Sequence, residues 1–353
     1  MEIDIARIDR VLIRGTNWVG DAVMSVPAMR EIRRRLPESR ISLLVRPWVK
    51  DVYGGADFLD EVIAYDREGL HAGLSGRRRL ISELRSRDFD LAILFQNAFE
   101  AALLAWWARI PKRIGYARDG RSLLLTHAIP IDPEVKQAHQ VYYYLGLLGG
   151  AGLGEPRPWG GFKPLPSCDL AVRESDGEAA RSLLRTHGIE AGEILIGLNP
   201  GASYGGAKRW LPDRFAEVAD HLAVKYSARI ILFGSGAELS ISQYVAAKMA
   251  CPSVNLAGKT TLGQLMGLIK ECALLVTNDS GPMHLAAALG VPQVAIFGST
   301  SDLATGPLSR LAEVVRVPAE CSPCFLRECP TDFRCMTGIT VSRVIAAAEK
   351  KLH

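Results

Sequence analysis

The sequence lacks the features of an exported or membrane-spanning protein. Its first ten residues alternate acidic and apolar side chains, without the basic start and apolar core of an export signal. No uninterrupted apolar run approaches the ~18–20 residues that a membrane span needs. The net charge is only +4 over 353 residues, which is too small a basic excess to indicate a nucleic-acid partner. We therefore expect a cytoplasmic protein that binds no nucleic acid and whose contact with a membrane is at most peripheral.

Cysteine is present, but it lacks the pattern of a strong metal signature. Four of the seven cysteines are clustered, at Cys321, Cys324, Cys329 and Cys335. Four thiolates can hold zinc or an iron–sulfur cluster, yet this spacing lacks two paired C-x2-C units. A cytoplasmic location also disfavours structural disulfides. We favour a reduced cysteine-rich loop with a packing role and predict no metal, with a metal site or a redox role as the alternatives.

Strand and helix patterns alternate along the whole chain. An apolar strand pattern at 10–14 precedes a helix pattern at 21–36, and the same succession returns with a strand at 193–198 and a helix at 212–226. Such alternation is typical of an α/β fold built on a doubly wound parallel sheet. A stretch rich in glycine and proline at 149–166 separates the two halves and indicates a linker.

The linker predicts two Rossmann-like domains, 1–165 and 166–353, that face each other across a cleft. The final helix, 341–353, is expected to close the second domain or to pack back on the first. In open parallel sheets, ligands bind at the carboxyl ends of the strands. The polar segments that follow the predicted strands are therefore the candidate sites.

The most informative of these segments is TNDSGPMH, at 277–284, between a short apolar strand and an Ala/Leu-rich helix. A helix N-terminus presents unpaired N–H groups and the positive end of the helix dipole, which suit phosphate oxygens. Ser280 and Gly281 would let a phosphate approach these backbone donors closely. The alternative is an ordinary Asp or Ser N-cap ahead of a core helix.

Three further segments of the second half also follow predicted strands or precede helices. NPGASYGGAKRW, at 199–210, fits a diphosphate because backbone donors can cradle it and Lys208 supplies charge; a flexible surface loop is the alternative. In FGSGAE, at 233–238, Glu238 could accept hydrogen bonds from a ribose or cap a helix. In LAGKTT, at 256–261, either threonine could be an N-cap.

The first half offers one candidate carboxylate and many arginines. GTNWVGD, at 15–21, ends the first predicted strand but is not G-x-G-x-x-G, so a nicotinamide cofactor is disfavoured. Asp21 is a candidate general base, or a carboxylate that stabilises a helix terminus. The arginine runs at 33–35 and 77–79 fit solvated helix faces or an acidic partner. This division predicts a nucleotide-linked donor in the second domain and an acidic acceptor in the first.

Taken together, the motifs resemble those of the bacterial ADP-heptose:lipopolysaccharide heptosyltransferases, glycosyltransferase family 9, and most closely the heptosyltransferase II type. The resemblance rests on GTNWVGDAVMSVPAM, GASYGGAKRW, FGSGAE, NLAGKTTL and TNDSGPMHLAAALG, and it runs from about Val11 to Leu352. It implies a GT-B fold and an inverting transfer that needs neither metal nor cofactor. The expected donor is ADP-L-glycero-D-manno-heptose, and the expected acceptor is the lipopolysaccharide inner core, at its first heptose. Peripheral contact with the inner membrane would follow from such an acceptor.

The resemblance also assigns roles to residues. Asp21 would be the general base, and Lys208 would stabilise the departing ADP phosphates, a role that other glycosyltransferases give to a metal. Donor-binding residues would be Gly20, Ser203, Lys208, Glu238, Thr260, Asp279, Ser280, Gly281 and His284. Candidate acceptor-binding residues are Arg14, Asn17, Trp18, Arg77, Arg78, Arg79, Gln96, Asn97 and Arg113, although Gln96 and Asn97 could equally cap the following helix.

Two other functions are compatible with parts of the sequence. One is another enzyme that uses a nucleotide sugar, either a transferase with a different donor or acceptor or an epimerase of similar fold. An epimerase would need its acid and base around the donor sugar, where Asp279 and His284 could act, but it would leave Asp21 without a role. The other is a non-enzymatic metal-binding or redox module built on the four clustered cysteines.

Overall fold

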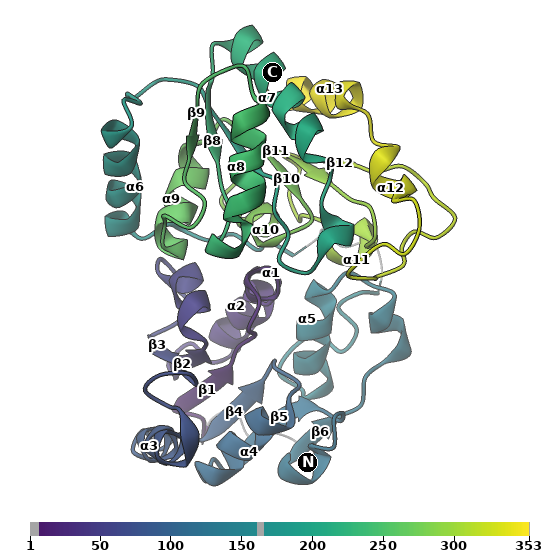
Figure 1. Ribbon diagram of the computed structural model, residues 1–353. Coiled ribbons are helices and arrows are strands. Elements are labelled where there is room, and N and C mark those ends of the chain that lie inside the picture. Colours follow the sequence, from purple (N-terminus) through teal and green to yellow (C-terminus); the bar gives the residue numbers. More distant parts are fainter. Residues whose placement is uncertain (1–6, 161–165, 353) are drawn as a thin grey trace. The chain divides into compact units, whose positions relative to one another are not determined.

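The computed structural model describes residues 7–160 and 166–352 (Figure 1). The chain forms two compact units, Met1–Cys168 and Asp169–His353. The predicted domain boundary after residue 165, and part of the predicted linker, fall on residues 161–165, which lie outside the described part. Within the described ranges, no helix is both long and apolar enough to cross a membrane.

The first unit is built on a six-stranded parallel sheet in the order β3-β2-β1-β4-β5-β6. This is the doubly wound Rossmann order, in which the strand order reverses between β1 and β4 and leaves a crevice at their carboxyl ends. The central strands are continuous apolar runs because helices bury both of their faces. The strands are β1 Arg10–Arg14, β2 Arg40–Val45, β3 Glu61–Ala64, β4 Leu91–Leu94, β5 Lys112–Tyr116 and β6 His127–Ile129.

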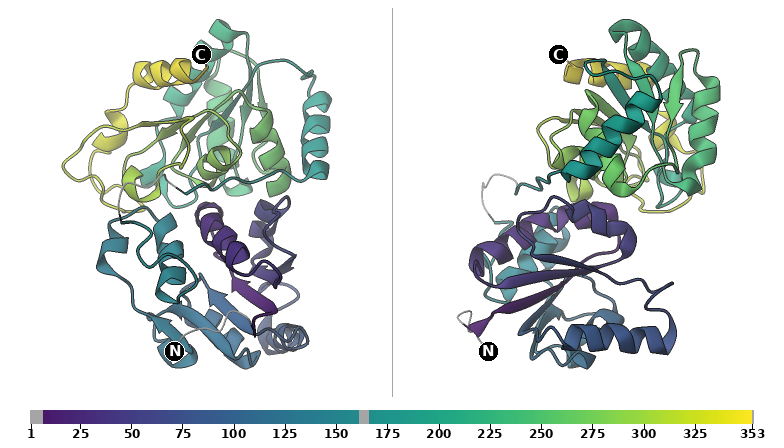
Figure 2. Two further views of the ribbon diagram at one scale, coloured as in Figure 1. Left: turned by 180° about the vertical axis from the view of Figure 1, so that it is seen from behind. Right: turned by 90° about the vertical axis from the view of Figure 1, so that its left-hand side faces the viewer.

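Helices cover both faces of this sheet (Figure 2). On one face, α3 and α4 contribute Leu80, Leu84, Ala102 and Ala105 to a core shared with the strands. On the other, α2 and α5 pack together. The helices are α1 Val19–Met24, α2 Val26–Arg35, α3 Gly73–Arg85, α4 Phe99–Trp107 and α5 Val141–Gly150, with short 3-10 helices η2 Pro47–Tyr53, η3 Ser122–Leu124 and η4 Pro133–Lys136.

The second unit repeats this plan, with a six-stranded parallel sheet in the order β12-β11-β10-β7-β8-β9. Its strands are β7 Leu195–Asn199, β8 Arg229–Leu232, β9 Ser253–Asn255, β10 Leu274–Asn278, β11 Gln293–Ile296 and β12 Ala312–Val315. Its helices are α6 Glu174–Thr186, α7 Pro212–Tyr226, α8 Leu239–Lys248, α9 Leu262–Glu271, α10 Gly281–Ala288, α11 Asp302–Thr305, α12 Arg334–Thr337 and α13 Val341–Leu352, with 3-10 helices η5 Gly206–Lys208 and η6 Gly236–Glu238. Each unit therefore has the α/β doubly wound fold that the sequence predicts.

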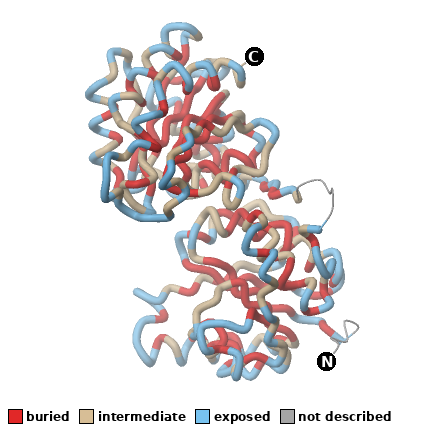
Figure 3. Tube along the Cα trace, turned by 90° about the vertical axis from the view of Figure 1, so that its right-hand side faces the viewer, coloured by how far each residue is buried: buried red, intermediate tan, exposed pale blue. Residues whose placement is uncertain are grey.

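Each unit has its own hydrophobic core, visible in Figure 3 as buried segments concentrated in the strands. In the second unit, the fully buried Trp210 packs edge-on against Phe215 with ring centroids 5.3 Å apart. Its indole N–H donates to the carbonyl of Ile339 at 3.1 Å, so the polar atom of this large side chain is satisfied. This residue fixes the point at which the glycine-rich loop after β7 enters α7.

The final helix, α13, packs within the second unit. Val344, Ala347 and Ala348 of α13 belong to the core of the second unit, where the helix packs against α7 and the strands β10 to β12. The apolar face of the final helix is therefore used within its own unit, as expected for a helix that closes the second domain.

The structure differs from the elements predicted from the sequence where a helix is broken, where strands are short and where a helix buries few residues. The helix predicted at 21–36 is two helices, α1 and α2, because Pro27 has no backbone N–H and lies in the first turn of the second. The edge strands β6 and β9 are three residues each and only partly buried, so no apolar run marks them. Helix α6 buries only Ala180 and Leu184, which leaves its apolar pattern weak.

Candidate active site

In the second unit, two loops predicted from the sequence meet where the strand order reverses. Strands β7 and β10 are neighbours, so the loops that follow them share one edge of the sheet. The Asn199 side-chain amide donates to the Ser280 hydroxyl at 2.9 Å and to the Thr277 hydroxyl at 3.1 Å. In return, the Asn278 amide donates to the carbonyl of Pro200 at 2.8 Å. The pair of asparagines at the strand ends therefore fixes one loop against the other.

Lys208 is held at this junction by an ion pair. Its Nζ lies 2.6 Å from Asp279 Oδ2, and the two side chains are only 14% and 4% exposed. The Thr300 hydroxyl donates to the same carboxylate oxygen at 2.5 Å. Nζ also lies 4.9 Å from the centre of the Tyr204 ring, which adds a cation–π contact. The cation is therefore fixed just ahead of α10.

The N-terminus of α10 is not capped by a side chain. Ser280 occupies the N-cap position, but its side chain accepts no hydrogen bond from the N–H groups of the helix, and its hydroxyl donates to the carbonyl of Asn278 at 3.1 Å. The Asp279 carboxylate is directed to Lys208 and Thr300. The alternative of an ordinary Asp or Ser N-cap is therefore wrong. Backbone donors and a lysine at one helix end form a site suited to phosphate oxygens. His284 is buried in the same helix.

The segment of clustered cysteines supports the loop that carries Lys208. Tyr204 Oη donates to the carbonyl of Phe325 at 2.9 Å, and the Ala207 N–H donates to that of Arg327 at 2.9 Å. The Gly206 N–H donates to Glu328 Oε1 at 3.0 Å. An added Cβ at Gly205 would lie 2.3 Å from the Arg327 carbonyl oxygen, so only glycine allows this approach. The segment thus positions Lys208 through backbone contacts.

The thiols of this segment do not form a metal-ligand set. Among residues 7–160 and 166–352, no three His, Cys, Asp or Glu side chains gather as metal ligands. Cys335 is buried in the core of the second unit, whereas Cys321 is exposed. Burial, together with the neighbouring thiols, raises the pKa of Cys335 above its usual range. The geometry therefore gives no support to a module built on a bound metal.

Glu238 and the loop before α9 have local structural roles. Glu238 Oε2 accepts from the backbone N–H and the hydroxyl of Ser235, both at 2.8 Å, and so completes a capping box. Its Oε1 faces Gly201, where an added Cβ would lie 2.5 Å away. Thr261 is the N-cap of α9, which leaves Thr260 half-buried beside it. Ser203 is exposed in the glycine-rich loop.

In the first unit, Asp21 lies in the first turn of α1, at the carboxyl end of β1. Tyr144 of α5 is buried, and its hydroxyl donates to Asp21 Oδ1 at 3.1 Å. Burial and the nearby negative charge raise the pKa of Tyr144 well above its usual range, so it stays a hydrogen-bond donor. The ring packs edge-on against Phe95 at 5.4 Å. The sequence shows a tyrosine-rich helix here but not which tyrosine faces Asp21.

Buried arginines lie at the carboxyl ends of β1 and β2. Arg14 donates to the carbonyls of Gly15 at 2.8 Å and Leu44 at 3.0 Å, while the Arg46 guanidinium lies 5.0 Å from the centre of the Tyr65 ring. Burial, and then the charge of Arg46, lowers the pKa of Arg14 to about 10. The Nε atoms of Arg14, Arg46 and Arg77 are buried without a hydrogen-bond partner. Such unsatisfied donors suit an anionic ligand.

Sequence reasoning missed Arg46, although a signal for it exists. Arg46 directly follows β2, so it lies at the same sheet edge as the loop that begins at Gly15. Asn17 and Trp18 belong to that edge: the indole N–H of Trp48 donates to the Asn17 carbonyl at 3.0 Å, and Trp18 is exposed. Arg77 is 3.9 Å from Glu100, near the same edge.

The other predicted acceptor residues do not join Arg14 and Arg46 in this group of buried arginines. Arg113 is near the amino end of β5, away from the carboxyl edge, and its guanidinium donates to backbone carbonyls, including that of Leu124 at 2.7 Å. Arg78 and Arg79 are exposed on α3, whose buried face is formed by other residues. The Asn97 amide donates to the Tyr143 hydroxyl at 2.9 Å, and Arg121 donates to the carbonyl of Gln96. Neither Gln96 nor Asn97 caps α4, whose N-cap is Ala98.

The chain resembles known transferases over nearly its whole length. The sequence profile of Glycosyltransferase family 9 (heptosyltransferase) matches residues 77–333. A Salmonella typhimurium protein named lipopolysaccharide heptosyltransferase 2 is 33% identical over 313 residues, covering 87% of this chain and 88% of that protein. An Escherichia coli protein of the same name is 31% identical over 318 residues, with the same coverage.

Solved structures agree with the sequence comparison. The structure of Escherichia coli ADP-heptose LPS heptosyltransferase II matches with a TM-score of 0.80 at 29% identity, covering 97% of this chain and 98% of that one. A family 9 glycosyl transferase from Veillonella parvula matches with a TM-score of 0.84 at 25% identity, covering 99% of both chains. The repeated Rossmann sheets and these matches define a glycosyltransferase of the GT-B architecture. The chain belongs to glycosyltransferase family 9, the heptosyltransferases.

Proposed function

We propose that the protein transfers heptose from ADP-L-glycero-D-manno-heptose to the lipopolysaccharide inner core, as the second heptose added to the first. The names of its relatives support this reaction, since they are lipopolysaccharide heptosyltransferases 2. The observation that carries the proposal is the placement of Lys208 and Asp279 ahead of the uncapped end of α10. This arrangement supplies a cation and backbone N–H donors for a diphosphate at the point where the order of the strands in the sheet reverses.

In this proposal, the second unit binds the donor. Lys208 and the N–H groups of α10 hold the diphosphate and stabilise the charge that develops on ADP as the glycosidic bond breaks. Asp279 orients Lys208 and binds heptose hydroxyls. Glu238 contacts the ribose through the oxygen left outside its capping box, and Thr260 lies near adenine. Ser203, Ser280, Gly281 and His284 complete the donor site in this unit, while Gly20, which the resemblance also assigns to the donor, lies in α1 of the first unit.

The first unit binds the acceptor and supplies the base. Asp21 accepts the proton of the acceptor hydroxyl as that oxygen attacks the anomeric carbon from the side opposite ADP, which inverts its configuration. The proton moves as the new bond forms, so a carboxylate of ordinary basicity suffices. Arg14, Arg46 and Arg77 bind acidic groups of the inner core, and Asn17 and Trp18 line the same edge. This reaction would take place at the cytoplasmic face of the inner membrane, where the protein would act as a peripheral enzyme.

The direct test measures ADP release from ADP-heptose with a heptose-deficient lipopolysaccharide acceptor that carries one core heptose. We expect release that depends on this acceptor. Release only with a heptose-free acceptor would reassign the protein to the first transfer step. Consumption of the donor without any acceptor would instead favour an epimerase or a hydrolase.

Tyr144→Phe is expected to change the pH dependence of transfer. Without the hydroxyl, the Asp21 carboxylate loses a donor that favours its charged form, so it protonates at a higher pH. We expect the acid limb of the kcat/KM profile to move upward by about one pH unit. Tyr143→Phe is the matched control, since its hydroxyl bonds Asn97 rather than Asp21. An unchanged acid limb in Tyr144→Phe would remove Tyr144 from this role.

Gly205→Ala is expected to lower turnover without touching Lys208 itself. The new Cβ would clash with the backbone of Arg327 and displace the loop, and small displacements of a catalytic group cost roughly tenfold to a hundredfold in rate. Gly236→Ala is the control, because an added Cβ there meets nothing within 4 Å. Steady-state ADP release distinguishes the two variants, and equal rates would show that the contact with the cysteine-rich segment is not needed.

A further inference from the structure

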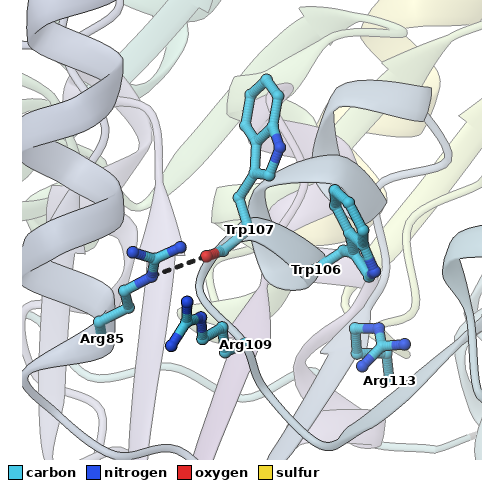
Figure 4. A pocket seen from close by; sticks show the side chains of 5 residues that line it. All are labelled: Arg85, Trp106, Trp107, Arg109 and Arg113. Atoms are coloured by element: carbon cyan, nitrogen blue, oxygen red, sulfur yellow. Dashed lines mark hydrogen bonds between the residues drawn. The ribbon is translucent and has the colours of Figure 1, made fainter.

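The first unit carries a second group of cations, at the edge of its sheet opposite Asp21. A pocket of about 400 Å³ is lined by Arg85, Trp106, Trp107, Arg109 and Arg113, which we name the arginine–tryptophan surface. Arg85 ends α3, Trp106 and Trp107 end α4, and Arg113 lies near the start of β5. Figure 4 shows both indoles projecting from the last turn of α4, with Arg85 and Arg109 side by side below the Trp107 carbonyl.

The positive charge of this surface is not neutralised by acidic side chains. Among the described residues, no carboxylate forms an ion pair with Arg85, Arg109 or Arg113, nor with the neighbouring Lys112. Arg85 instead donates to the Trp107 carbonyl at 2.8 Å, and Arg113 donates to the carbonyls of Leu124, Ile110 and Pro111. The C-terminal dipoles of α3 and α4 attract cations here, but the guanidinium faces that point outward remain available to an external anion.

Arg109 is placed in a backbone conformation that costs energy. Its φ is +62°, in the left-handed region, at the position just beyond α4 where glycine is the usual residue. Its N–H donates to the Trp106 carbonyl at 2.9 Å, which closes the helix end. An arginine at this position places its side chain at the end of the helix, in the pocket that Trp106 also lines.

Large apolar side chains surround these cations. Trp106 and Trp107 are 48% and 37% exposed. Leu123 is 96% exposed in η3, next to Leu124, whose carbonyl binds Arg113. η3 packs against α4, so Leu123 is an exposed apolar side chain in a segment that neighbours this surface. Exposed tryptophans with nearby arginines match the chemistry of a bilayer interface, where indoles lie at the headgroup level and cations meet lipid phosphates.

We propose that the arginine–tryptophan surface docks the protein on an anionic lipid bilayer. The arginines and Lys112 would bind headgroup phosphates while Trp106 and Leu123 enter the interface. A pocket for a soluble metabolite would enclose its ligand, whereas Trp106, Trp107 and Arg109 here are all exposed. The proposal rests on the proposed function for the lipid-linked acceptor. The five residues of β1 alone span roughly 15–17 Å between the two edges of the sheet, so the acceptor sugar would have to extend around the unit by more than this length to reach Asp21.

Co-sedimentation of the full chain with vesicles tests the proposal without either substrate. We expect binding to vesicles of three parts phosphatidylglycerol and seven parts phosphatidylcholine, little binding to pure phosphatidylcholine, and weaker binding as salt is raised. Arg85→Gln with Arg109→Gln should lower the partition coefficient about fivefold per cation, so roughly 25-fold together. Trp106→Ser should lower it further. Equal binding to both kinds of vesicle, or unchanged binding by the double variant, would overturn the proposal.

Controls separate this surface from general charge and from the transfer reaction. Arg343→Gln with Tyr244→Ser removes one exposed cation and one exposed aromatic ring from the second unit and should leave vesicle binding unchanged. Thermal melting checks that each variant is folded. Displacement of bound protein by millimolar glycerol phosphate at constant ionic strength would indicate a site for a soluble anion and overturn bilayer docking. ADP release in detergent is measured separately, so a failure of the proposed function is distinguished from a failure of docking.

Discussion

Asp21→Asn is expected to lower kcat for acceptor-dependent ADP release by about 10²–10⁴-fold, the usual contribution of a positioned general base. The amide has nearly the size of the carboxylate and can still contact Tyr144, so the local fold should survive. Binding of ADP, measured by thermal shift or calorimetry, should change little because the residues proposed to hold the diphosphate lie in the second unit. The combination of lost turnover and retained ADP binding is the specific expectation.

The control for this variant is Asp119→Asn, which removes a carboxylate from a partly exposed ion pair with Arg118. It should retain nearly full activity, since such pairs contribute little. A loss below tenfold in Asp21→Asn would show that another group takes the proton, and the assignment of Asp21 as the general base would be wrong.

Lys208→Met is expected to lower kcat by roughly 10²–10³-fold, because charge develops on the ADP phosphates as the bond to heptose breaks. The ADP affinity should fall as well, since the same cation contacts the product. The variant also leaves Asp279 buried without its cation, which by itself can destabilise a protein by about 3–5 kcal/mol. Activity and stability therefore have to be measured together.

A double variant separates the two effects. Lys208→Met with Asp279→Asn removes both charges and should recover most of the lost thermal stability, while transfer stays low. Lys208→Arg keeps the charge and should retain more activity than Lys208→Met. If the double variant recovered transfer along with stability, Lys208 would be a structural residue and the leaving-group role would be wrong.

Much of the fold could be predicted because its signals are local. Long apolar strands such as Leu274–Asn278 and helices such as Pro212–Tyr226 have clear patterns in the sequence. The edge strand Ser253–Asn255 has three half-buried residues, so its pairing with β8 decides its conformation more than its composition does. The break between α1 and α2 at Ser25 differs, because the sequence does contain a local signal for it. Pro27 falls within one predicted helix, 21–36, although it lies in the first turn of a second helix.

The candidate site was predicted only as far as the sheet edge defines it. Asp21, Lys208 and Asp279 each follow a strand in the sequence, so the rule that ligands bind at strand ends locates them. Tyr144 and Thr300 contact Asp21 and Asp279 from distant segments, and no spacing in the sequence indicates such pairings. Arg113 shows that a basic residue near a strand is not enough to predict a binding residue. It lies toward the amino end of β5, whereas ligands bind at the carboxyl ends of the strands.

The ion pair between Lys208 and Asp279 has a consequence for selectivity and turnover. A free phosphate or any other small anion must compete with a carboxylate already 2.6 Å from Nζ. A nucleotide sugar can offset that competition through its other contacts, whereas inorganic phosphate cannot, so the site should discriminate against the abundant free anion. In the proposed reaction, the same internal carboxylate would compete with ADP once heptose has left, and it would thereby assist product release between catalytic cycles.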